Sequence, residues 1–419
     1  MTGKQKLILA FLILVFGAHI FMSASNHPAR GGDFRGFLIA GERILHGDFL
    51  YQDSRVATNV TWPPFFAIFI IPFSLLARIH VQFAQLIWYL FNAALFFLTV
   101  RLWCRIIGKW PFAWFDEKQP GSLYSMSVFL PIVFVVISIF RVFEPLQMNI
   151  ILLYFMSLAV YQYQNKNDVK AGAWLGLAAA IKVFPGLMAP YFIYRKKWKL
   201  LFTFGLTGLA LTLLPMIRYG FTGYIANLQA WSHIALQGGY PVGGINQSFY
   251  AMAARWIASD AWALVTVKLP APDPYALGTV LSGWLHRGFY LAALFALAVA
   301  AHRKKVNSPA LEGAFLIAAA MLFSPIAWRN YFILTYPAYF VLYNIWQEKK
   351  DRFLLWGILV SVFLVSFLQI VGQFHKHLRG FFNCVISSLT TGTILLLILI
   401  VYVIMKGMVP VRLSSDQPE

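Results

Sequence analysis

Long apolar runs separated by short basic clusters constrain the fold of this chain more than any other feature. The runs at 81–103 and 382–405 are each long enough to cross a bilayer as a helix, which takes about 20 residues. Of the 419 residues, 60% are hydrophobic and only 12% are charged, so a soluble core could not hide this much apolar surface. The sequence therefore predicts an all-α polytopic membrane protein with about twelve transmembrane or membrane-embedded helices.

The basic residues set the expected orientation in the membrane. The net charge is +19, but the lysines and arginines stand in short clusters between apolar spans, so we expect no nucleic-acid partner. Clusters at 195–199, 303–305 and 349–352 are typical of cytoplasmic loops. This orientation predicts a multi-pass protein of the cell inner (plasma) membrane with both termini cytoplasmic. Cys104 and Cys384 then lie at opposite faces, so we expect no disulfide between them.

A polar segment at 26–64 interrupts the apolar runs early in the chain and is expected outside the membrane. Its apolar residues recur at the spacing of one helical face: Phe34, Phe37, Leu38, Gly41, Ile44 and Leu45. This pattern predicts an amphipathic helix lying along the membrane surface. Asp33 stands at the start of that helix, where a carboxylate is either an N-cap or a reactive group held at the membrane boundary.

The apolar runs on either side of this segment complete the start of the topology. The run Leu7–Met22 is predicted as an uncleaved first span, in preference to a signal peptide, because the topology requires it. The run at 63–76 is too short to span and opens with Pro63 and Pro64, which suit a helix N-terminus. We therefore expect a second juxtamembrane helix there, interfacial or re-entrant, in the first outer loop.

The segment 171–194 lies between basic clusters that are both expected inside. Pro185 and Pro190 interrupt it, and neither half is long enough to cross about 30 Å alone. The pattern predicts a hairpin of two short helices that enters from the inside and returns there. Its tip carries Lys182 into the membrane, where a buried lysine is a candidate functional residue.

The remaining apolar runs place the other spans. A short amphipathic helix is expected at 249–257, after the second outer loop. Besides 81–103 and 382–405, spans are expected at 126–140, 146–163, 200–217, 280–301, 312–325, 331–346 and 353–371.

Seven stretches, in this order, carry a resemblance to a known family. They read GGDF, HGDFLY, WPPFFAIFIIPF, EPLQMNIILLYF, AGAWLGLAAAIKVFPGLMAPYFIYRKKW, NQSFYAMAARW and LFSPIAWRNYF. Over about Leu7 to Phe340 the chain resembles glycosyltransferase family 87, the polyprenyl-phosphate-mannose-type transferases of the GT-C fold. The resemblance implies a single GT-C-like domain at 1–412 followed by a short cytoplasmic tail at 413–419. Outer loops 24–80 and 219–278 would form its catalytic face.

Two positions depart from the family's pattern. Leu146 stands before Gln147 where the family often has glycine. Arg329 and Asn330 follow Trp328 where the family often has histidine. The second departure bears on the donor contacts and therefore on the identity of the sugar.

The resemblance implies an inverting transfer, in which an acceptor hydroxyl attacks the anomeric carbon of a lipid-phosphate-linked sugar. Such a displacement needs a general base beside the attacking hydroxyl, and Asp33 matches the position of the family's outer-loop acid. Asp48 and Asp53 are weaker candidates, expected in solvated turns. The sugar would be mannose or a related hexose, and the acceptor a lipid or a glycan on the extracytoplasmic face.

The leaving phosphate must be stabilised as its charge develops, a task for cationic side chains or aligned amides. The candidates for the donor phosphate are Lys182, Arg329, Arg287 and His233. For each, the alternative is a snorkelling or orienting charge. The candidates for substrate contacts are Asn246, Gln247, Glu144, Gln147 and Trp62. Asn246 and Gln247 could instead cap the helix that follows them.

The sequence holds no D-x-D motif, no His/Cys cluster and no glycine-rich phosphate loop after a strand. We therefore expect no metal and no cofactor, and a donor other than a metal-bound nucleotide sugar. The expected partners are the polyprenyl-phosphate-linked sugar, the acceptor and the lipid bilayer.

A transporter or flippase of lipid-linked sugars is the competing hypothesis, because broken short helices also suit alternating access. Such a protein should have two matching halves, whereas the two long outer loops of this chain differ and no internal repeat is visible. A non-catalytic membrane scaffold would leave the outer carboxylate and arginines without a role.

Overall fold

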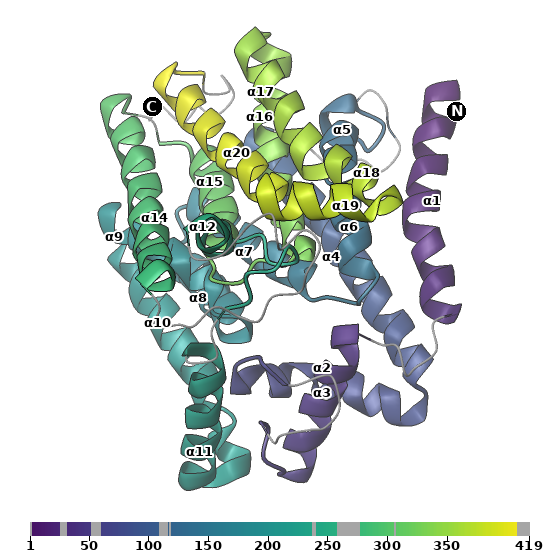
Figure 1. Cartoon of the computed structure of the whole chain (residues 1–419), viewed down its shortest axis with the longest axis vertical. Coiled ribbons are helices and arrows are strands. Elements are labelled where there is room, and N and C mark those ends of the chain that lie inside the picture. The colour runs from purple at the N-terminus through teal and green to yellow at the C-terminus, as the bar shows by residue number, and fades with distance from the viewer. Residues whose placement is uncertain are drawn as a thin grey trace.

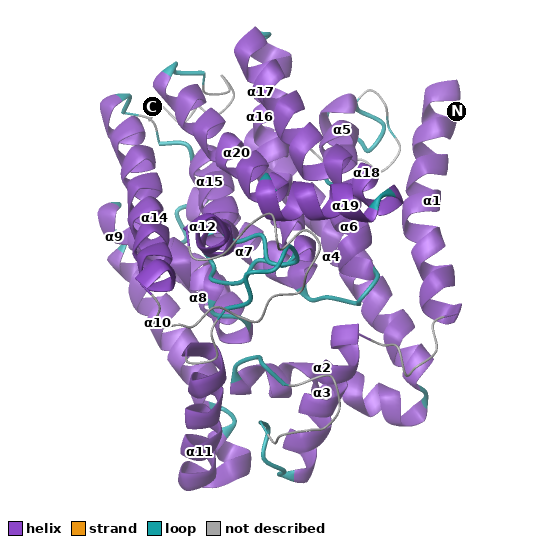
Figure 2. Cartoon of the chain, viewed as in Figure 1, coloured by secondary structure: helices purple, strands orange, loops and turns teal. Residues whose placement is uncertain are grey.

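A computed structural model describes residues 2–25, 32–51, 60–108, 116, 119–236, 240–257, 277–305 and 307–408, with only the backbone of 18–25 and 32. Asp53 and the tail at 413–419 lie outside the described residues. Helices make up nearly all regular structure in the described part, and its one isolated β-bridge joins Asn246 to Trp328 (Figure 2). The fold is therefore all-α, as the sequence predicts.

Four described helices are long and apolar enough to cross a membrane. They are α4 (Val81–Gly108), α14 (Leu277–Arg303), the continuous helix Arg352–Phe374 made of α17, η4 and α18, and α20 (Ser388–Met405). Two bent pairs raise the number of possible spans to six. The chain is thus a multi-pass membrane protein, while the expected count of about twelve embedded helices is not confirmed.

Two expected spans are bent, which corrects the simple runs at 126–140 and 200–217. The first is α5 (Met126–Phe134) followed by α6 (Val136–Phe143), bent by 58° where Val135 leaves helical geometry. The second is α10 (Trp198–Leu213) followed by α11 (Met216–Leu236), bent by 91°. Pro215 stands at this second bend, where its missing N–H and its ring disfavour a continuous helix.

Other runs form shorter elements than the sequence indicates. The run at 146–163 is α7 (Asn149–Gln164), and the run at 312–325 is α15 (Pro309–Leu322), a helix of 14 residues. The run at 331–346 divides into the 3₁₀ helix η3 (Arg329–Thr335) and α16 (Tyr336–Lys349). The predicted helix at 249–257 is confirmed as α12 (Phe249–Ile257).

The start of α1 and the end of α20 lie at the same end of the molecule (Figure 1). Helix α1 (Gly3–Ser25) runs from that end, and α20 returns to it. Helices α2 (Gly32–His46) and α3 (Pro64–Ile79) lie at the opposite end, together with α11. The described ends of α1 and α20 thus lie away from the helix pair α2 and α3, while the side of the membrane that each end faces stays a prediction.

The two juxtamembrane helices pack tightly on each other. The predicted apolar face of α2 is buried at Phe34, Phe37 and Ile44. A Cβ added at Gly41 would collide with the Ser74 side chain of α3, so glycine permits this close approach. The Ser74 hydroxyl donates to the Leu38 carbonyl at 3.2 Å. Helix α3 begins with proline at its first position, as its sequence predicts.

The predicted hairpin at 171–194 is confirmed as α8 (Asp168–Ile181), the 3₁₀ helix η2 (Phe184–Met188) and α9 (Ala189–Tyr194). Its two ends come together, because Lys197 Nζ lies 3.4 Å from the Asp168 carboxylate. The chain therefore turns back at Lys182, which follows α8 in extended conformation.

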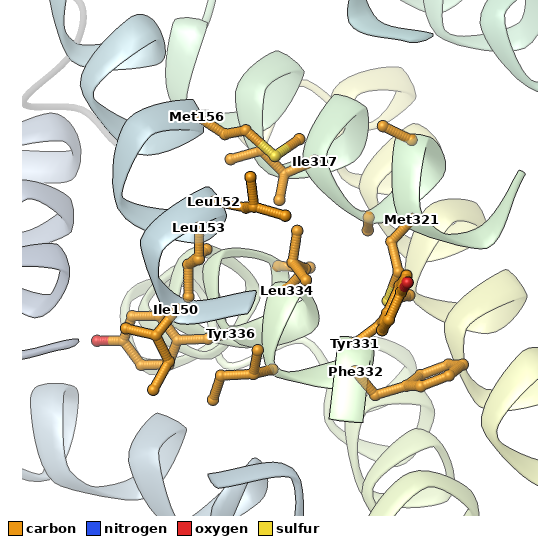
Figure 3. Packing of buried hydrophobic residues seen from close by; sticks show 14 of the residues in the cluster. Ile150, Leu152, Leu153, Met156, Ile317, Met321, Tyr331, Phe332, Leu334 and Tyr336 are labelled. Atoms are coloured by element: carbon orange, nitrogen blue, oxygen red, sulfur yellow. The ribbon is translucent and has the colours of Figure 1, made fainter. Parts of the chain in front are cut away.

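The central core joins helices that are distant in sequence. Figure 3 shows side chains of α7, α15, η3 and α16 packed together: Ile150, Leu152, Leu153, Met156, Ile317, Met321, Tyr331, Phe332, Leu334 and Tyr336. Cys104 and Cys384 are both buried, and neither forms a disulfide.

Candidate functional site

Asp33 lies in the first turn of α2, after Gly32, and not at the N-cap position that the sequence offered as one alternative. Its carboxylate accepts a hydrogen bond from the side-chain amide of Gln147. Gln147 is 3% exposed and stands in the turn between α6 and α7. The carboxylate of the first outer loop is therefore held by a residue from a distant part of the chain.

The hairpin brings Lys182 to the same place. Lys182 Nζ lies 4.0 Å from the centroid of the Tyr331 ring and interacts electrostatically with Asp33. Burial raises the pKa of the Asp33 carboxyl above its usual value, and the positive charge of Lys182 acts in the opposite direction. We call Asp33, Gln147, Lys182 and Tyr331 the carboxylate site. It combines a partly buried carboxylate with the cation Lys182, a setting suited to a general base.

The late sequence motif contributes Arg329 to a second group of charges. Arg329 interacts electrostatically with Arg141, Arg379 and Glu144. Arg141 Nη1 donates to Glu144 at 2.9 Å, and the Glu144 side chain is 63% exposed. Burial lowers the pKa of Arg329 to about 10; Arg141 and Arg379 act in the same direction, and Glu144 opposes them. We call these four residues the arginine cluster.

Two short segments connect the carboxylate site to the arginine cluster. The turn after α6 carries Glu144 and Gln147, one residue in each group. The start of η3 likewise contains one residue of each group, Arg329 of the arginine cluster and Tyr331 of the carboxylate site. Asn149 Nδ2 donates to Asn330 Oδ1 at 3.0 Å and ties the two segments together. The two groups are thus neighbours on one continuous framework.

Asn246 is engaged by the protein itself. It is 1% exposed, and its Nδ2 donates to the carbonyls of Pro241 and Pro325 at 2.8 and 3.1 Å. Its Oδ1 accepts from the backbone N–H groups of Ser248 and Ala327 at 3.1 and 3.0 Å. These bonds use both donors and both acceptor positions of the amide, which favours the structural alternative over sugar binding.

Gln247 is also buried and bonded to the chain. Its Nε2 donates to the carbonyls of Gly244 and Asn383 at 3.0 and 2.7 Å. The two amides therefore fix the loop before α12, Asn246 against the segment before η3 and Gln247 against the segment before α20. A substrate contact by either residue stays a prediction.

The contacts given for Arg287 and Trp62 are with residues other than Asp33, and His233 lies on a different helix. Arg287 is exposed on α14, with its guanidinium 5.2 Å from the Trp284 ring centroid. His233 is exposed on α11. Trp62 is 9% exposed and packs edge-on against Phe37 of α2 at 4.6 Å. Trp62 thus supports the helix that carries Asp33, while roles in substrate binding stay predictions.

Sequence reasoning gave no role to Tyr331, and it named Arg141 and Arg379 only among the outer basic residues for which an anionic ligand on that side is a reason. Tyr331 follows Arg329 by two positions within a quoted stretch, so its position was a usable signal. The two arginines stand at expected outer boundaries, where positive charge opposes the orientation rule. Among the described residues, no group of three or more His, Cys, Asp or Glu side chains could hold a metal ion.

The model of glycosyltransferase family 87 matches residues 61–327. No curated protein matches the chain. The chain is similar to the crystal structure of ArnT from Cupriavidus metallidurans in the apo state, with 13% identity and a TM-score of 0.35 over 94% of this chain and 76% of that one. It is also similar to ArnT from Cupriavidus metallidurans bound to undecaprenyl phosphate, with 12% identity and a TM-score of 0.38 over 97% of this chain and 78% of that one.

Proposed function

This chain belongs to glycosyltransferase family 87, and from that premise we propose how this membrane glycosyltransferase works and on what. It transfers a sugar, with inversion, from a polyprenyl-phosphate donor to a lipid or glycan acceptor. The sugar is mannose or a related hexose. The reaction takes place on the extracytoplasmic face of the inner membrane, with both termini in the cytoplasm.

The observation that carries this proposal is the partly buried Asp33 carboxylate, which accepts a hydrogen bond from Gln147 and interacts electrostatically with Lys182. In the transfer step the acceptor oxygen forms a bond to the anomeric carbon on the face opposite the phosphate. The bond from that carbon to the phosphate oxygen breaks, and its electron pair leaves with the lipid phosphate. The Asp33 carboxylate takes the proton of the attacking hydroxyl.

Each neighbour of Asp33 has a role that follows from its contact. The Gln147 amide donates to the carboxylate and fixes its orientation, so Gln147 is a positioning residue. Lys182 supplies a positive charge that favours the ionised form of Asp33, the form needed to accept a proton. Tyr331 lies under Lys182 and limits where its ammonium group can go.

The helix pair α2 and α3 presents this site. Phe34 and Phe37, one and four positions after Asp33, are fully buried and pack on Trp88 of the spanning helix α4 with ring centroids 5.4 and 5.7 Å apart. The proposed base, Asp33, therefore belongs to a helix that packs on α4 through apolar side chains, and not to a loop.

The proposal is tested with purified protein in liposomes that contain a polyprenyl-phosphate mannose carrying a radioactive label in the sugar. Transfer predicts label in the acceptor and one unlabelled polyprenyl phosphate released for each sugar moved. A flippase would instead move the intact labelled lipid between leaflets without breaking its glycosidic bond. Translocation of intact donor with no labelled acceptor, using a panel of glycan and lipid acceptors, would contradict the proposal.

A further inference from the structure

Arg218 of α11 caps the end of α2, the helix that carries Asp33. Its Nε donates to the Ile44 carbonyl at 3.1 Å, and its Nη2 donates to the Leu45 carbonyl at 2.9 Å. Both carbonyls belong to the last turn of α2, where a helix has no internal donor for them. A positive charge at this end also interacts favourably with the helix dipole. Arg218 therefore holds the C-terminal end of α2 from another helix at the same end of the molecule (Figure 1).

Two further hydrogen bonds join α11 to the turn that follows α2. The Tyr219 hydroxyl donates to the Asp48 carbonyl at 2.9 Å. The backbone N–H of Leu50 donates to Asn227 Oδ1 at 2.8 Å, and these two residues are 0% and 1% exposed. Breaking a hydrogen bond shielded from water in this way leaves buried polar groups unpaired, which is costly. The end of α2 and its turn are therefore fixed to α11 together.

The backbone of Gly220 shapes α11 for these contacts. Gly220 has φ of 65° and ψ of 179° inside α11, a conformation that is almost confined to glycine. It separates a first turn, which contains Arg218 and Tyr219, from the longer part of the helix, which contains Asn227. Both parts contact α2 or the turn after it, although the helix is broken between them. The break therefore gives the two parts of α11 the different directions that they need.

The far end of α11 is linked to another part of the carboxylate site. The Tyr240 hydroxyl donates to the Ala235 carbonyl near the end of α11 at 3.1 Å. Tyr240 belongs to the loop that contains Asn246, and Asn246 Oδ1 accepts from the backbone N–H of Ala327 at 3.0 Å. Ala327 stands just before η3, which contains Tyr331. Hydrogen bonds and short chain segments thus lead from α2 through α11 to η3.

We propose that α11 sets the position of the general base and that Arg218 is a positioning residue for the transfer. This inference rests on the proposed function and deepens it. Arg218 acts through α2: Asp33 lies in the first turn and Ile44 in the last, about 16 Å apart at about 1.5 Å per residue. The packing of Phe34 and Phe37 holds α2 on α4, but apolar contacts are non-directional. Directional hydrogen bonds at the end of α2 therefore fix its orientation.

The position of α2 matters because the Asp33 carboxylate must meet the proton of the attacking hydroxyl within hydrogen-bond reach. A misplacement of about 1 Å can lower a rate by about 100-fold. A shift of α2 would also move the carboxylate away from the Gln147 amide, which belongs to a different element. Binding of the donor phosphate does not require the base. Loss of Arg218 should therefore lower turnover and leave phosphate binding intact.

The test measures turnover for Arg218→Met in two backgrounds, with polyprenyl-phosphate mannose as donor. In the otherwise unchanged protein, transfer should fall by about 10- to 100-fold. In the Asp33→Asn background the same change should alter the residual transfer by less than about twofold, because the misplaced group is no longer a base. Arg218→Lys keeps a charged donor at the helix end and should recover part of the loss. The matched control Arg303→Met, at an exposed arginine of α14, should transfer within about twofold of the unchanged protein.

Two further measurements separate positioning from a general loss of structure. Equilibrium dialysis of Arg218→Met in detergent should show binding of tritiated farnesyl phosphate within about twofold of the unchanged protein. Amide hydrogen exchange, followed by mass spectrometry, should become faster in α2 and stay unchanged in α8. Tyr219→Phe removes only the hydroxyl that bonds the Asp48 carbonyl, so it tests the same contact if Arg218→Met does not fold. Its transfer should fall less than that of Arg218→Met, and again only while Asp33 is present.

Four results would overturn the positioning role. They are unchanged transfer in both Arg218→Met and Tyr219→Phe, an equal loss in the two backgrounds, a loss of farnesyl phosphate binding as large as the loss of transfer, and unchanged hydrogen exchange in α2.

Failure of this inference is distinct from failure of the proposed function. Normal transfer by the unchanged protein and by both α11 variants would retain the glycosyltransferase mechanism and reject the role of α11. Absence of transfer by the unchanged protein, with every acceptor, would overturn the proposed function and the positioning role with it. Hydrogen exchange needs no acceptor, so faster exchange in α2 of Arg218→Met would still show that α11 holds this helix.

Discussion

The Gln147 side chain donates a hydrogen bond to the Asp33 carboxylate across 114 positions of the chain. One partner belongs to the juxtamembrane helix α2 and the other to the turn between α6 and α7. The carboxylate site therefore forms only when the outer loop is docked on the membrane part. We therefore expect substitutions in α2, in the turn between α6 and α7 or in the hairpin around Lys182 to affect this site.

Lys182→Met should move the acidic limb of the pH–rate profile to higher pH. The positive charge of Lys182 lowers the pKa of Asp33 against the raising effect of burial, so its removal raises that pKa. More of Asp33 is then protonated at a given pH, and a protonated carboxyl cannot act as the base. Lys182→Arg keeps the charge and should stay closer to the unchanged profile. An acidic limb that does not move in Lys182→Met would contradict the assigned role.

Leu146→Gly should be less destabilising than Leu146→Ala. Leu146 has φ of 53°, a left-handed conformation that costs about 1 kcal/mol or more for a residue with a Cβ. Both substitutions remove the same buried side chain, which is 6% exposed, but only glycine relieves the backbone. The glycine variant should therefore be more stable than the alanine variant by about 1 kcal/mol in denaturant titrations of the protein in mixed micelles. The opposite order would show that this turn is not strained.

Arg195→Met should destabilise the protein by about 3–5 kcal/mol, because it leaves the Glu312 carboxylate buried without its ion-pair partner. Arg195 Nη2 lies 2.5 Å from Glu312 Oε1, and the Glu312 side chain is 1% exposed. Arg195 follows the hairpin that contains Lys182, and Glu312 belongs to α15, so this ion pair holds the end of the hairpin against α15. The double variant Arg195→Met with Glu312→Gln removes the uncompensated charge and should recover part of the loss. If the Arg195→Met variant were as stable as the unchanged protein, the ion pair between Arg195 and Glu312 would have no stabilising role.

Cysteines introduced at two exposed positions test the orientation. Thr61 lies just before α3, and Lys199 lies near the start of α10, in an expected inside cluster. In intact cells or right-side-out vesicles, Thr61→Cys should react with a membrane-impermeant maleimide and Lys199→Cys should not. Cys104 and Cys384 are buried, which keeps the background low. The reverse labelling pattern would place the carboxylate site on the cytoplasmic face.

The sequence predicted those elements whose pattern is local. The apolar face of α2, the proline start of α3, the amphipathic helix α12 and the hairpin around Lys182 all follow from spacing, proline positions and basic flanks. The bends between α5 and α6 and between α10 and α11 were missed because hydropathy averages over a window and does not register one residue with non-helical torsions.

The candidate site was predictable only in part. Asp33 and Lys182 were nominated separately, because an outer carboxylate and a membrane lysine are each unusual. The hydrogen bond from Gln147 and the electrostatic interaction of Arg329 with Arg379 depend on tertiary packing, which no local pattern encodes. The glycine that the family often has before Gln147 now has a physical reason, since Leu146 occupies a conformation that favours glycine.

The most direct test of the central claim is transfer by Asp33→Asn. Asparagine keeps the size of the side chain and can still accept the hydrogen bond from Gln147, so the variant should fold and bind farnesyl phosphate normally. It cannot accept a proton, so transfer from polyprenyl-phosphate mannose should fall by about 10²- to 10⁴-fold. Glu144→Gln, which alters an exposed carboxylate of the arginine cluster, should not cause a loss of that size. Near-normal transfer by Asp33→Asn would contradict the account and leave Asp33 as a structural carboxylate.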